Sequence, residues 1–220
     1  GEGAGGGRWR AEVAVAPTAG AGRGLPASVR GDGTMRRFLI LALAIFTSSV
    51  AATAVHAAGN PCEGEMARAS KKYEVPLGML YAVGLTESGH KESLQPHAMN
   101  IEGKPYFATS LADAIRQYNE ATAGGAKMID IGCMQINHYF HGEKFASVEA
   151  MFDPHQNVDY AARFLKGLRA QEGSWTLAVA RYHAGPNNNP AQKRYVCTVI
   201  TNMVATGFGS WTPEAKAFCN

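Results

Sequence analysis

The sequence has no uninterrupted run of about 20 apolar residues, the length that a membrane-spanning helix requires. Residues 58–220 also have no excess of basic side chains, because 15 Lys and Arg are balanced there by 15 Asp and Glu. A basic face supplies most of the affinity of nucleic-acid-binding proteins, so nucleic acid is excluded as a partner. The formal net charge of +3 lies entirely in the first 57 residues.

Those first 57 residues fall into two parts. Residues 1–34 are rich in Gly, Ala and Arg, have no apolar period and do not begin with Met, so we expect disorder or a translation start set too early. From Met35, a basic pair is followed by the short apolar run FLILALAIF and by small residues ending in Val55-His56-Ala57. This pattern predicts a signal peptide over 35–57, cleavage, and an exported, periplasmic mature domain over 58–220. A retained membrane anchor is the alternative.

Cysteine is scarce, and its four residues all lie in the mature part: Cys62, Cys133, Cys197 and Cys219. An even count in an exported chain predicts disulfides rather than thiol chemistry. Four cysteines allow three pairings. The nearness of the last two in the sequence favours Cys197–Cys219, which leaves Cys62 with Cys133.

The mature part shows helical periodicity and no repeats. Helices are expected over 62–73, from Leu77 to Gly89, from a capping box at Ser110, from Asp153-Pro154, from Ser174 and from Asn189-Pro190. A short piece around 128–137 is the only strand pattern. The predicted fold is therefore mainly α, a single domain with a small irregular or β element.

Glu87 lies near the C-terminal end of the helix from Leu77, one turn beyond Val83. This spacing places it at the rim of the apolar stripe formed by Leu77, Leu80 and Tyr81 rather than on the solvent face. Partial burial and the negative end of the helix dipole both raise the pKa of a carboxyl group. A raised pKa is what a general acid working near neutral pH needs, although most glutamates at helix ends are simply solvated.

Glu87 belongs to an ordered set of three motifs. Glu87-Ser88 is followed by Gly132-Cys133-Met134-Gln135-Ile136-Asn137 and then by Ala180-Arg181-Tyr182-His183-Ala184-Gly185. These elements resemble, in the same order, the E-S, G-L-M-Q and A-Y-N-A-G motifs of the goose-lysozyme-like (SLT-type) lytic transglycosylase family. The resemblance covers about 62–203 and implies a lysozyme-like fold.

The resemblance also implies roles for individual residues. Glu87 would be the catalytic acid and then the base, and Ser88 would orient Glu87 or the substrate. Met134, Gln135 and Asn137 would bind the sugars, with Gln135 able to donate and accept hydrogen bonds. Tyr182 would direct its hydroxyl toward Glu87, a role compatible with core packing.

Two residues depart from the family pattern. Cys133 replaces Leu, so a disulfide is expected to brace the floor of the sugar groove. His183 replaces Asn among the substrate-binding candidates, which leaves its role open. The segment 101–131 between the first two motifs carries its own helix and glycine loop, and is expected to form a groove wall or a docking surface.

His138, His141 and Glu143 form an H-x-x-H-x-E pattern. Metal binding is rejected because the H-E-x-x-H arrangement and a third ligand are both missing, and a polar rim loop is predicted instead. The family chemistry likewise needs neither metal nor cofactor.

The resemblance implies cleavage of the β-1,4 bond between N-acetylmuramic acid and N-acetylglucosamine in peptidoglycan strands, with formation of a 1,6-anhydro ring. A hydrolytic muramidase is the nearest alternative, with Asp130 as its second carboxylate. A catalytically idle peptidoglycan-binding or assembly protein and a membrane-anchored structural protein are further alternatives. Wall turnover, flagellar insertion and work with an envelope-spanning secretion apparatus would look alike in this sequence.

Overall fold

The computed structural model describes residues 59–91, 93–185 and 189–220. The expected segments 1–34 and 35–57 lie outside these residues. Within the described ranges, no helix is both long and apolar enough to cross a membrane. The elements in chain order are α1 Pro61–Tyr73, α2 Leu77–Ser88, β1 Ala98–Ile101, β2 Lys104–Phe107, α3 Leu111–Ala123, β3 Ile129–Ile131, β4 Ile136–Asn137, α4 His138–His141, the 3₁₀ turn η1 Gly142–Lys144, α5 Val148–Phe152, α6 Pro154–Glu172, α7 Trp175–Ala184, α8 Asn189–Ala205 and α9 Pro213–Cys219.

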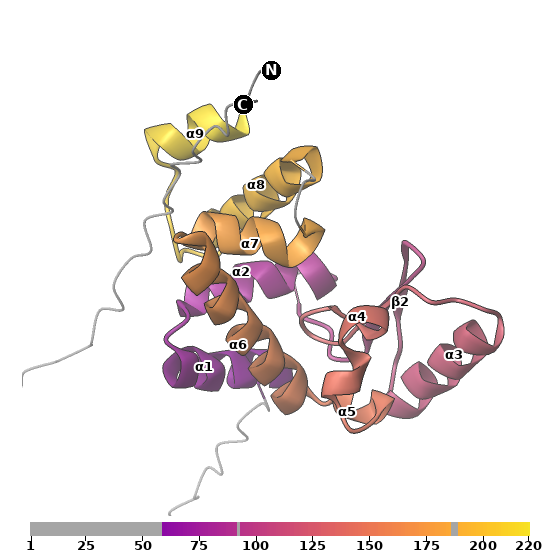
Figure 1. The fold of residues 1–220 in the computed structure, drawn as a ribbon. Helices are drawn as coiled ribbons and strands as arrows, with labels where there is room; N and C mark the ends of the chain where they lie inside the picture. Colours follow the sequence, from indigo (N-terminus) through magenta and orange to yellow (C-terminus); the bar gives the residue numbers. More distant parts are fainter. Residues whose placement is uncertain (1–58, 92, 186–188) are drawn as a thin grey trace, which may run out of the picture. The chain divides into compact units, whose positions relative to one another are not determined.

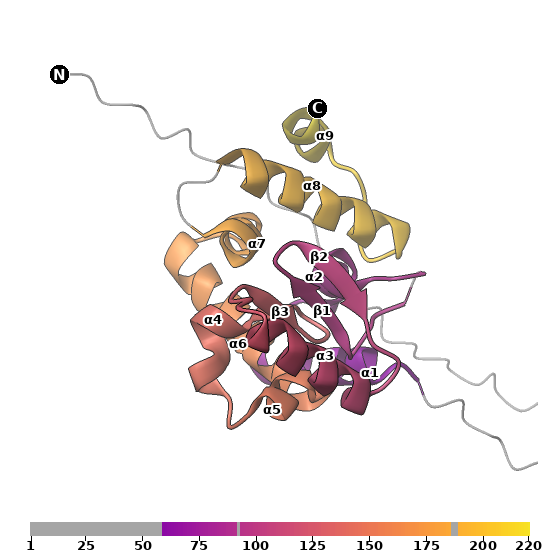
Figure 2. The same ribbon diagram turned by 90° about the vertical axis from the view of Figure 1, so that its right-hand side faces the viewer.

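Helices α1, α2, α6, α7 and α8 form one packed group, and the strands lie beside it with α3, α4 and α5 (Figure 1). Helix α1 contacts α2 and α6, α6 contacts α7, and α8 contacts both α2 and α7. In the view turned by 90°, the strands and α3 face the viewer with α8 and α9 above them (Figure 2). The prediction of a mainly α fold with a small β element is confirmed.

Local capping explains where the predicted helices begin. The side chains of Ser110, Asp153 and Ser174 accept hydrogen bonds from backbone N–H groups in the first turns of α3, α6 and α7. The capping box at Ser110 is only half formed, because the Asp113 carboxylate accepts from the Thr109 N–H rather than from that of Ser110.

Helix α2 differs from the amphipathic helix that the sequence suggested. The predicted stripe is wrong in part, because Leu77 and Tyr81 are only partly buried whereas Met79 and Val83 are fully buried. The reason is that α2 has neighbours on more than one side, α1 and α8. At Gly84 the approach is so close that a Cβ atom would lie 2.4 Å from Cε of Met66 in α1.

The sheet is antiparallel with the strand order β2-β1-β3-β4. The strands near 128–137 were expected, whereas the β1–β2 hairpin was missed. Its turn places Glu102 and Gly103 at positive φ, and the Asn100 side chain accepts a hydrogen bond from the Gly103 N–H. Because strand side chains alternate between faces, one face carries core residues such as Ile131 and the other carries Asn100, Asp130 and Asn137.

Both predicted disulfides form. Cys62–Cys133 joins the start of α1 to the turn between β3 and β4. Cys197–Cys219 joins α8 to α9, a short C-terminal helix that the sequence reading did not include. Among the described residues there is no free cysteine.

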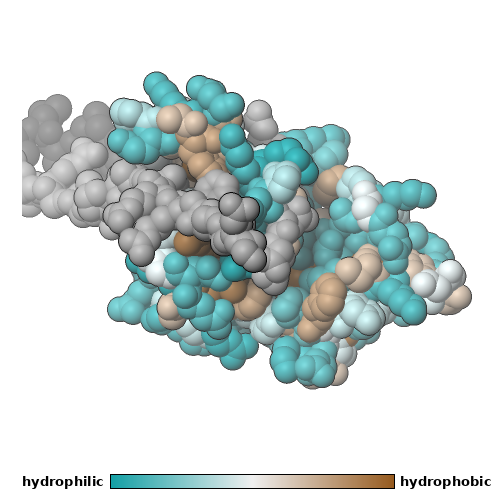
Figure 3. All heavy atoms as spheres, turned by 45° about the horizontal axis from the view of Figure 1, so that its top comes forward, coloured by the Kyte–Doolittle hydropathy of each residue, from teal (hydrophilic) through white to brown (hydrophobic). Residues whose placement is uncertain are grey.

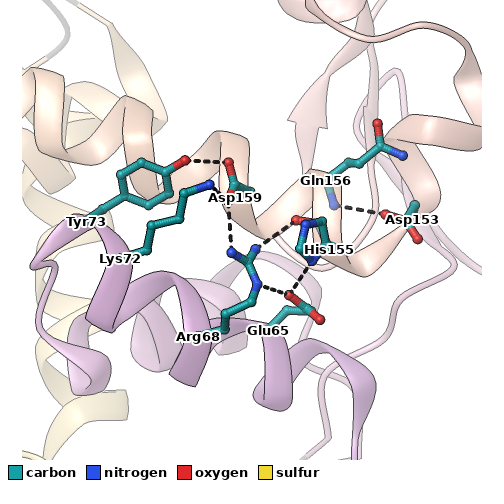
Figure 4. A network of polar contacts seen from close by, with 8 residues as sticks. All are labelled: Glu65, Arg68, Lys72, Tyr73, Asp153, His155, Gln156 and Asp159. Atoms are coloured by element: carbon teal, nitrogen blue, oxygen red, sulfur yellow. Dashed lines mark hydrogen bonds and ion pairs between the residues drawn. The ribbon is translucent and has the colours of Figure 1, made fainter.

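A polar network joins α1 to the N-terminal half of α6 (Figure 4). Its centre is Asp159, whose carboxylate accepts hydrogen bonds from Arg68, Lys72 and the Tyr73 hydroxyl. Arg68 also binds Glu65, which in turn contacts His155.

Polar side chains predominate over the face drawn in Figure 3, where the apolar ones form separate small groups.

Candidate active site around Glu87

Glu87 lies in the last turn of α2, which ends where the Gly89 N–H donates to the Leu85 carbonyl. Its side chain is partly buried, and its Oε1 accepts a hydrogen bond of 2.5 Å from the Tyr195 hydroxyl. Burial raises the pKa of Glu87 to about 8; the hydrogen bond from Tyr195 opposes this shift and the nearby charge of Asp130 adds to it. At neutral pH the group therefore holds its proton.

Tyr182 does not make the contact that the motif comparison implied. Its hydroxyl donates to the backbone carbonyl of Met134 at 2.7 Å, not to Glu87. The tyrosine is still close to the acid, because burial and then the charges of Glu87 and Asp130 raise the pKa of Tyr182 well above its usual value. The expectation is corrected: the phenol bound to Glu87 comes from α8, and Tyr182 holds the turn before β4.

Tyr195 was missed by sequence reasoning, although a signal for it exists. It lies on the buried face of α8 with Val196, Val199 and Met203, and only 5% of its surface is exposed. A buried tyrosine in an apolar stripe needs a partner for its hydroxyl. A search of the helix after the third motif for such a residue would have found it.

Ser88 is buried, with 1% of its surface exposed, and its hydroxyl donates to the Cys133 carbonyl at 2.7 Å. This geometry fits the expected role of orienting Glu87 at the end of α2, whereas a role of Ser88 in substrate binding stays a prediction. The Cys62–Cys133 disulfide reaches the same turn from α1. The turn is thus joined both to α1 and to the residue after Glu87.

The turn Gly132–Gln135 needs two left-handed residues, Gly132 with φ of 82° and Gln135 with φ of 45°. A Cβ atom on Gly132 would lie 2.6 Å from Nδ2 of Asn157, so only glycine fits. Asn157 is completely buried; it donates to the Ile131 and Met151 carbonyls and accepts from the Met134 N–H. No motif indicated this residue of α6, which holds the turn in place through its three hydrogen bonds.

The fixed turn limits what its side chains can do. Met134 is completely buried, so the expectation that its side chain lines an open groove is wrong. Gln135 is partly exposed, and its Nε2 donates to the carbonyls of Ala98 and Gly132. Its Oε1 is the part of the amide left to accept a hydrogen bond from a ligand.

Asn137 and Asp130 face each other across β3 and β4, and Asn137 Nδ2 donates to Asp130 Oδ1 at 2.7 Å. Burial raises the pKa of Asp130, while this hydrogen bond opposes the shift. The polar face of the sheet thus brings a second carboxyl group into the electrostatic surroundings of Glu87.

His183 lies near the end of α7 with its ring stacked on that of Tyr195; the ring centres are 4.2 Å apart and the planes differ by 4°. Burial and the neighbouring Arg194 lower the pKa of His183, so the imidazole is neutral at pH 7. Of the residues singled out by the three motifs, Glu87 and His183 therefore share one partner, Tyr195.

The residues of the H-x-x-H-x-E pattern are separated by their partners. His138 contacts the Tyr118 hydroxyl, His141 the Tyr160 hydroxyl, and Glu143 the Lys144 ammonium group. Within the part of the chain that the structure describes, no three His, Cys, Asp or Glu side chains are grouped as a metal site would require. The loop is polar at one end and aromatic in α4, where Tyr139 and Phe140 are exposed.

A mainly α frame that holds a protonated glutamate beside a polar sheet face defines a class of protein that can use general acid catalysis. Comparison with known families gives the next step: the Transglycosylase SLT domain, which is lysozyme-like, matches residues 65–202 and confirms the predicted lysozyme-like fold. The chain belongs to this family, whose activity is of the peptidoglycan lytic transglycosylase type. Neither the search of curated proteins nor that of solved structures gave a match.

Proposed function

We propose that the protein is a lytic transglycosylase that cleaves the β-1,4 bond between N-acetylmuramic acid and N-acetylglucosamine and leaves 1,6-anhydro ends. The observation that carries this proposal is Glu87, a carboxyl group with a pKa of about 8 at the end of a buried helix. Family membership supplies the substrate class, the glycan strands of peptidoglycan.

One carboxyl group performs both proton transfers. Glu87 gives its proton to the glycosidic oxygen as the bond to the muramyl C1 breaks, and the N-acetylglucosamine leaves with a free hydroxyl. The carboxylate then takes the proton from the muramyl C6 hydroxyl, whose oxygen forms the new bond to C1. The attacking group belongs to the same sugar, which favours it over water. No water is consumed, Glu87 returns to its protonated form, and no cofactor is required.

The surrounding residues prepare this acid for its task. The Tyr195 hydroxyl occupies Oε1, which leaves Oε2 to carry the proton toward the sugar. Ser88 and Cys133 hold the end of α2 to the turn. We expect Oε1 of Gln135, whose Nε2 is already engaged, and the polar sheet face with Asn137 to bind sugar hydroxyl and amide groups.

A hydrolytic muramidase is the competing function, and one observation favours it. Asp130 is close enough for its charge to raise the pKa of Glu87, so a second carboxyl group is present. Against it, Asp130 Oδ1 already accepts a hydrogen bond from Asn137 Nδ2, so this oxygen is engaged within the sheet. Burial raises the pKa of Asp130, which weakens its ability to act as the ionised second carboxylate that hydrolysis needs.

We further propose export to the periplasm through the leader 35–57, because peptidoglycan is reached only there. A protein that binds strands without cutting them would bind equally well with Glu87→Gln and release nothing in either form. Partnership with an envelope-spanning apparatus is compatible with this function but has no residue of its own to support it.

The product distinguishes the two activities. Purified protein is incubated with bacterial sacculi, and the released muropeptides are weighed by mass spectrometry. A transglycosylase releases 1,6-anhydromuramic ends, lighter by one water than the hydrolytic product. Reducing ends, together with loss of release in Asp130→Asn, would assign the hydrolase instead.

A further inference from the structure

His183 is the motif residue that the proposed mechanism has not used. Its ring lies parallel to that of Tyr195, with 4.2 Å between the ring centres. Among the described residues its ring nitrogens form no hydrogen bond, so this stack is its main contact. An exposed imidazole would be free to turn, whereas this one is held flat against the phenol that binds Glu87.

The two rings come from different helices, and a hydrogen bond joins these helices beside the rings. His183 is in the last turn of α7, and Gly185 follows with φ of 57°. Gln192, in the first part of α8, donates from Nε2 to the Gly185 carbonyl. Tyr195 lies one turn further along α8, so the ring pair and this hydrogen bond join the two helices at neighbouring points.

The Tyr195 hydroxyl distinguishes the two oxygens of the Glu87 carboxyl group. A phenol donates one hydrogen bond, and here it goes to Oε1 of Glu87. Tyr182, the other tyrosine near the acid, already donates to Met134 and does not replace it. If the Tyr195 ring moves, Oε1 and Oε2 become equivalent and the proton is no longer directed to one oxygen.

We propose that His183 is a positioning residue: its flat imidazole holds the Tyr195 hydroxyl on Oε1 of Glu87 and so keeps the acid proton on Oε2. The consequence for catalysis rests on the proposed function, whereas the effect on Glu87 itself does not. Since burial and Arg194 keep the imidazole neutral, an uncharged aromatic ring such as that of phenylalanine should hold the Tyr195 ring equally well. A small side chain should not.

The first experiment is a double-mutant cycle on muropeptide release. His183→Ala should lower kcat about tenfold with little change in KM, and Tyr195→Phe should lower it similarly. The double variant should have a kcat little lower than that of either single variant, because both substitutions disrupt the same hydrogen bond, from Tyr195 to Glu87. His183→Phe should keep most of the wild-type kcat, and His155→Ala, an imidazole in the α1–α6 network, serves as the control.

The second experiment needs no substrate. The Glu87 carboxyl carbon is followed by ¹³C NMR during a pH titration, with Glu87→Gln identifying its resonance. Tyr195→Phe should raise the pKa of Glu87 when His183 is present, because a hydrogen bond to the carboxylate is lost. In the H183A background the same substitution should change the titration much less, and in the H183F background it should have its full effect.

The proposal is overturned if Tyr195→Phe shifts the Glu87 titration equally in the His183 and H183A backgrounds, or if His183→Phe loses as much kcat as His183→Ala. If the Glu87 titration depends on residue 183 as expected but the protein releases no muropeptides, then the positioning role stands and the proposed function is rejected. Thermal unfolding of each variant separates these results from loss of fold.

Discussion

Two acidic side chains of this molecule each accept a hydrogen bond from a tyrosine, yet their pKa values are shifted in opposite directions. Asp159 in α6 is bound by Tyr73 at 2.6 Å, and Glu87 in α2 by Tyr195 at 2.5 Å. Burial raises the pKa of both. For Asp159 the hydrogen bonds of Tyr73, Lys72 and Arg68 outweigh it and lower the pKa to about 2, whereas the pKa of Glu87 rises to about 8.

The difference lies in the neighbours beyond the tyrosine. The α1–α6 network supplies two cations to Asp159, so its charge is compensated (Figure 4). The surroundings of Glu87 supply phenols and a second carboxyl group. A phenol alone does not keep a partly buried carboxylate ionised; cations do. The same chain thus contains one carboxylate built for stability and one carboxylic acid kept ready to give up a proton.

The strongest way to break this comparison is Glu87→Gln. Release of muropeptides should fall by at least about 100-fold, since general acid catalysis contributes about 10²–10⁴ in rate. The variant should still fold, and at high pH it should be more stable than the wild type. Wild-type protein holds a proton on Glu87 that the unfolded chain has lost, so its free energy of unfolding falls as pH rises from about 4.5 to about 8.

Activity assays and urea unfolding at pH 4 and pH 9 check both parts. The variant and the wild type should have similar stabilities at pH 4, and the variant should be the more stable at pH 9. A stability difference independent of pH would mean that Glu87 titrates normally, and retained lysis would remove it from the mechanism.

The next effect is one of stability alone. Asp159→Asn should lower the free energy of unfolding near neutral pH by about 1–3 kcal/mol, because hydrogen bonds to a charged group are lost and two cations are left without it. The sign is opposite to that of Glu87. The pKa is lowered on folding, so the stabilisation is present above about pH 3.8 and is lost as pH falls through about 2.

Glu120→Gln is the matched control, since the Arg116–Glu120 pair is exposed and should contribute at most about 1 kcal/mol. Denaturant unfolding of the three proteins at pH 7 and pH 2.5 measures the effect. Muropeptide release should be unchanged in both variants. A large loss of activity in Asp159→Asn without unfolding would join the network to the site.

The sequence was sufficient for the frame of the site. Hydrogen-bonding residues at helix starts, such as Asp153 and Ser174, are local signals, and they were interpreted correctly. The even number of cysteines is a property of the whole mature part, and it too was interpreted correctly. The β1–β2 hairpin escaped because four-residue strands leave little periodicity, although the Glu102-Gly103 turn was visible. Local signals determine where elements begin and end.

What surrounds Glu87 could not be predicted in the same way. Tyr182 and Tyr195 are both tyrosines on apolar stripes, and only the packing of α8 on α2 decides which one meets the acid. The burial of Met134 likewise depends on Asn157, which is 23 residues away in the sequence and holds its N–H from below. Partners set by packing between distant segments leave no pattern in a single sequence.

The smallest expected changes in pKa come from removing a single hydrogen bond from each acid, the one that it accepts from a tyrosine hydroxyl. Tyr195→Phe takes a hydrogen bond from the ionised form of Glu87, so its pKa should rise and the alkaline limit of kcat should move up by about 0.5–1 pH unit, as a bond of about 1 kcal/mol implies. Tyr73→Phe removes the matching bond from Asp159, should cost about 1 kcal/mol of stability, and should leave the pH dependence of kcat unchanged. The measurement is kcat from pH 5 to pH 10 for both variants, with unfolding at pH 7. If the two substitutions shift the pH dependence alike, or if Tyr195→Phe moves the limit to lower pH, then the phenol does not stabilise the carboxylate. The opposite pKa shifts of the two acids could then no longer be assigned to the cations around Asp159 alone.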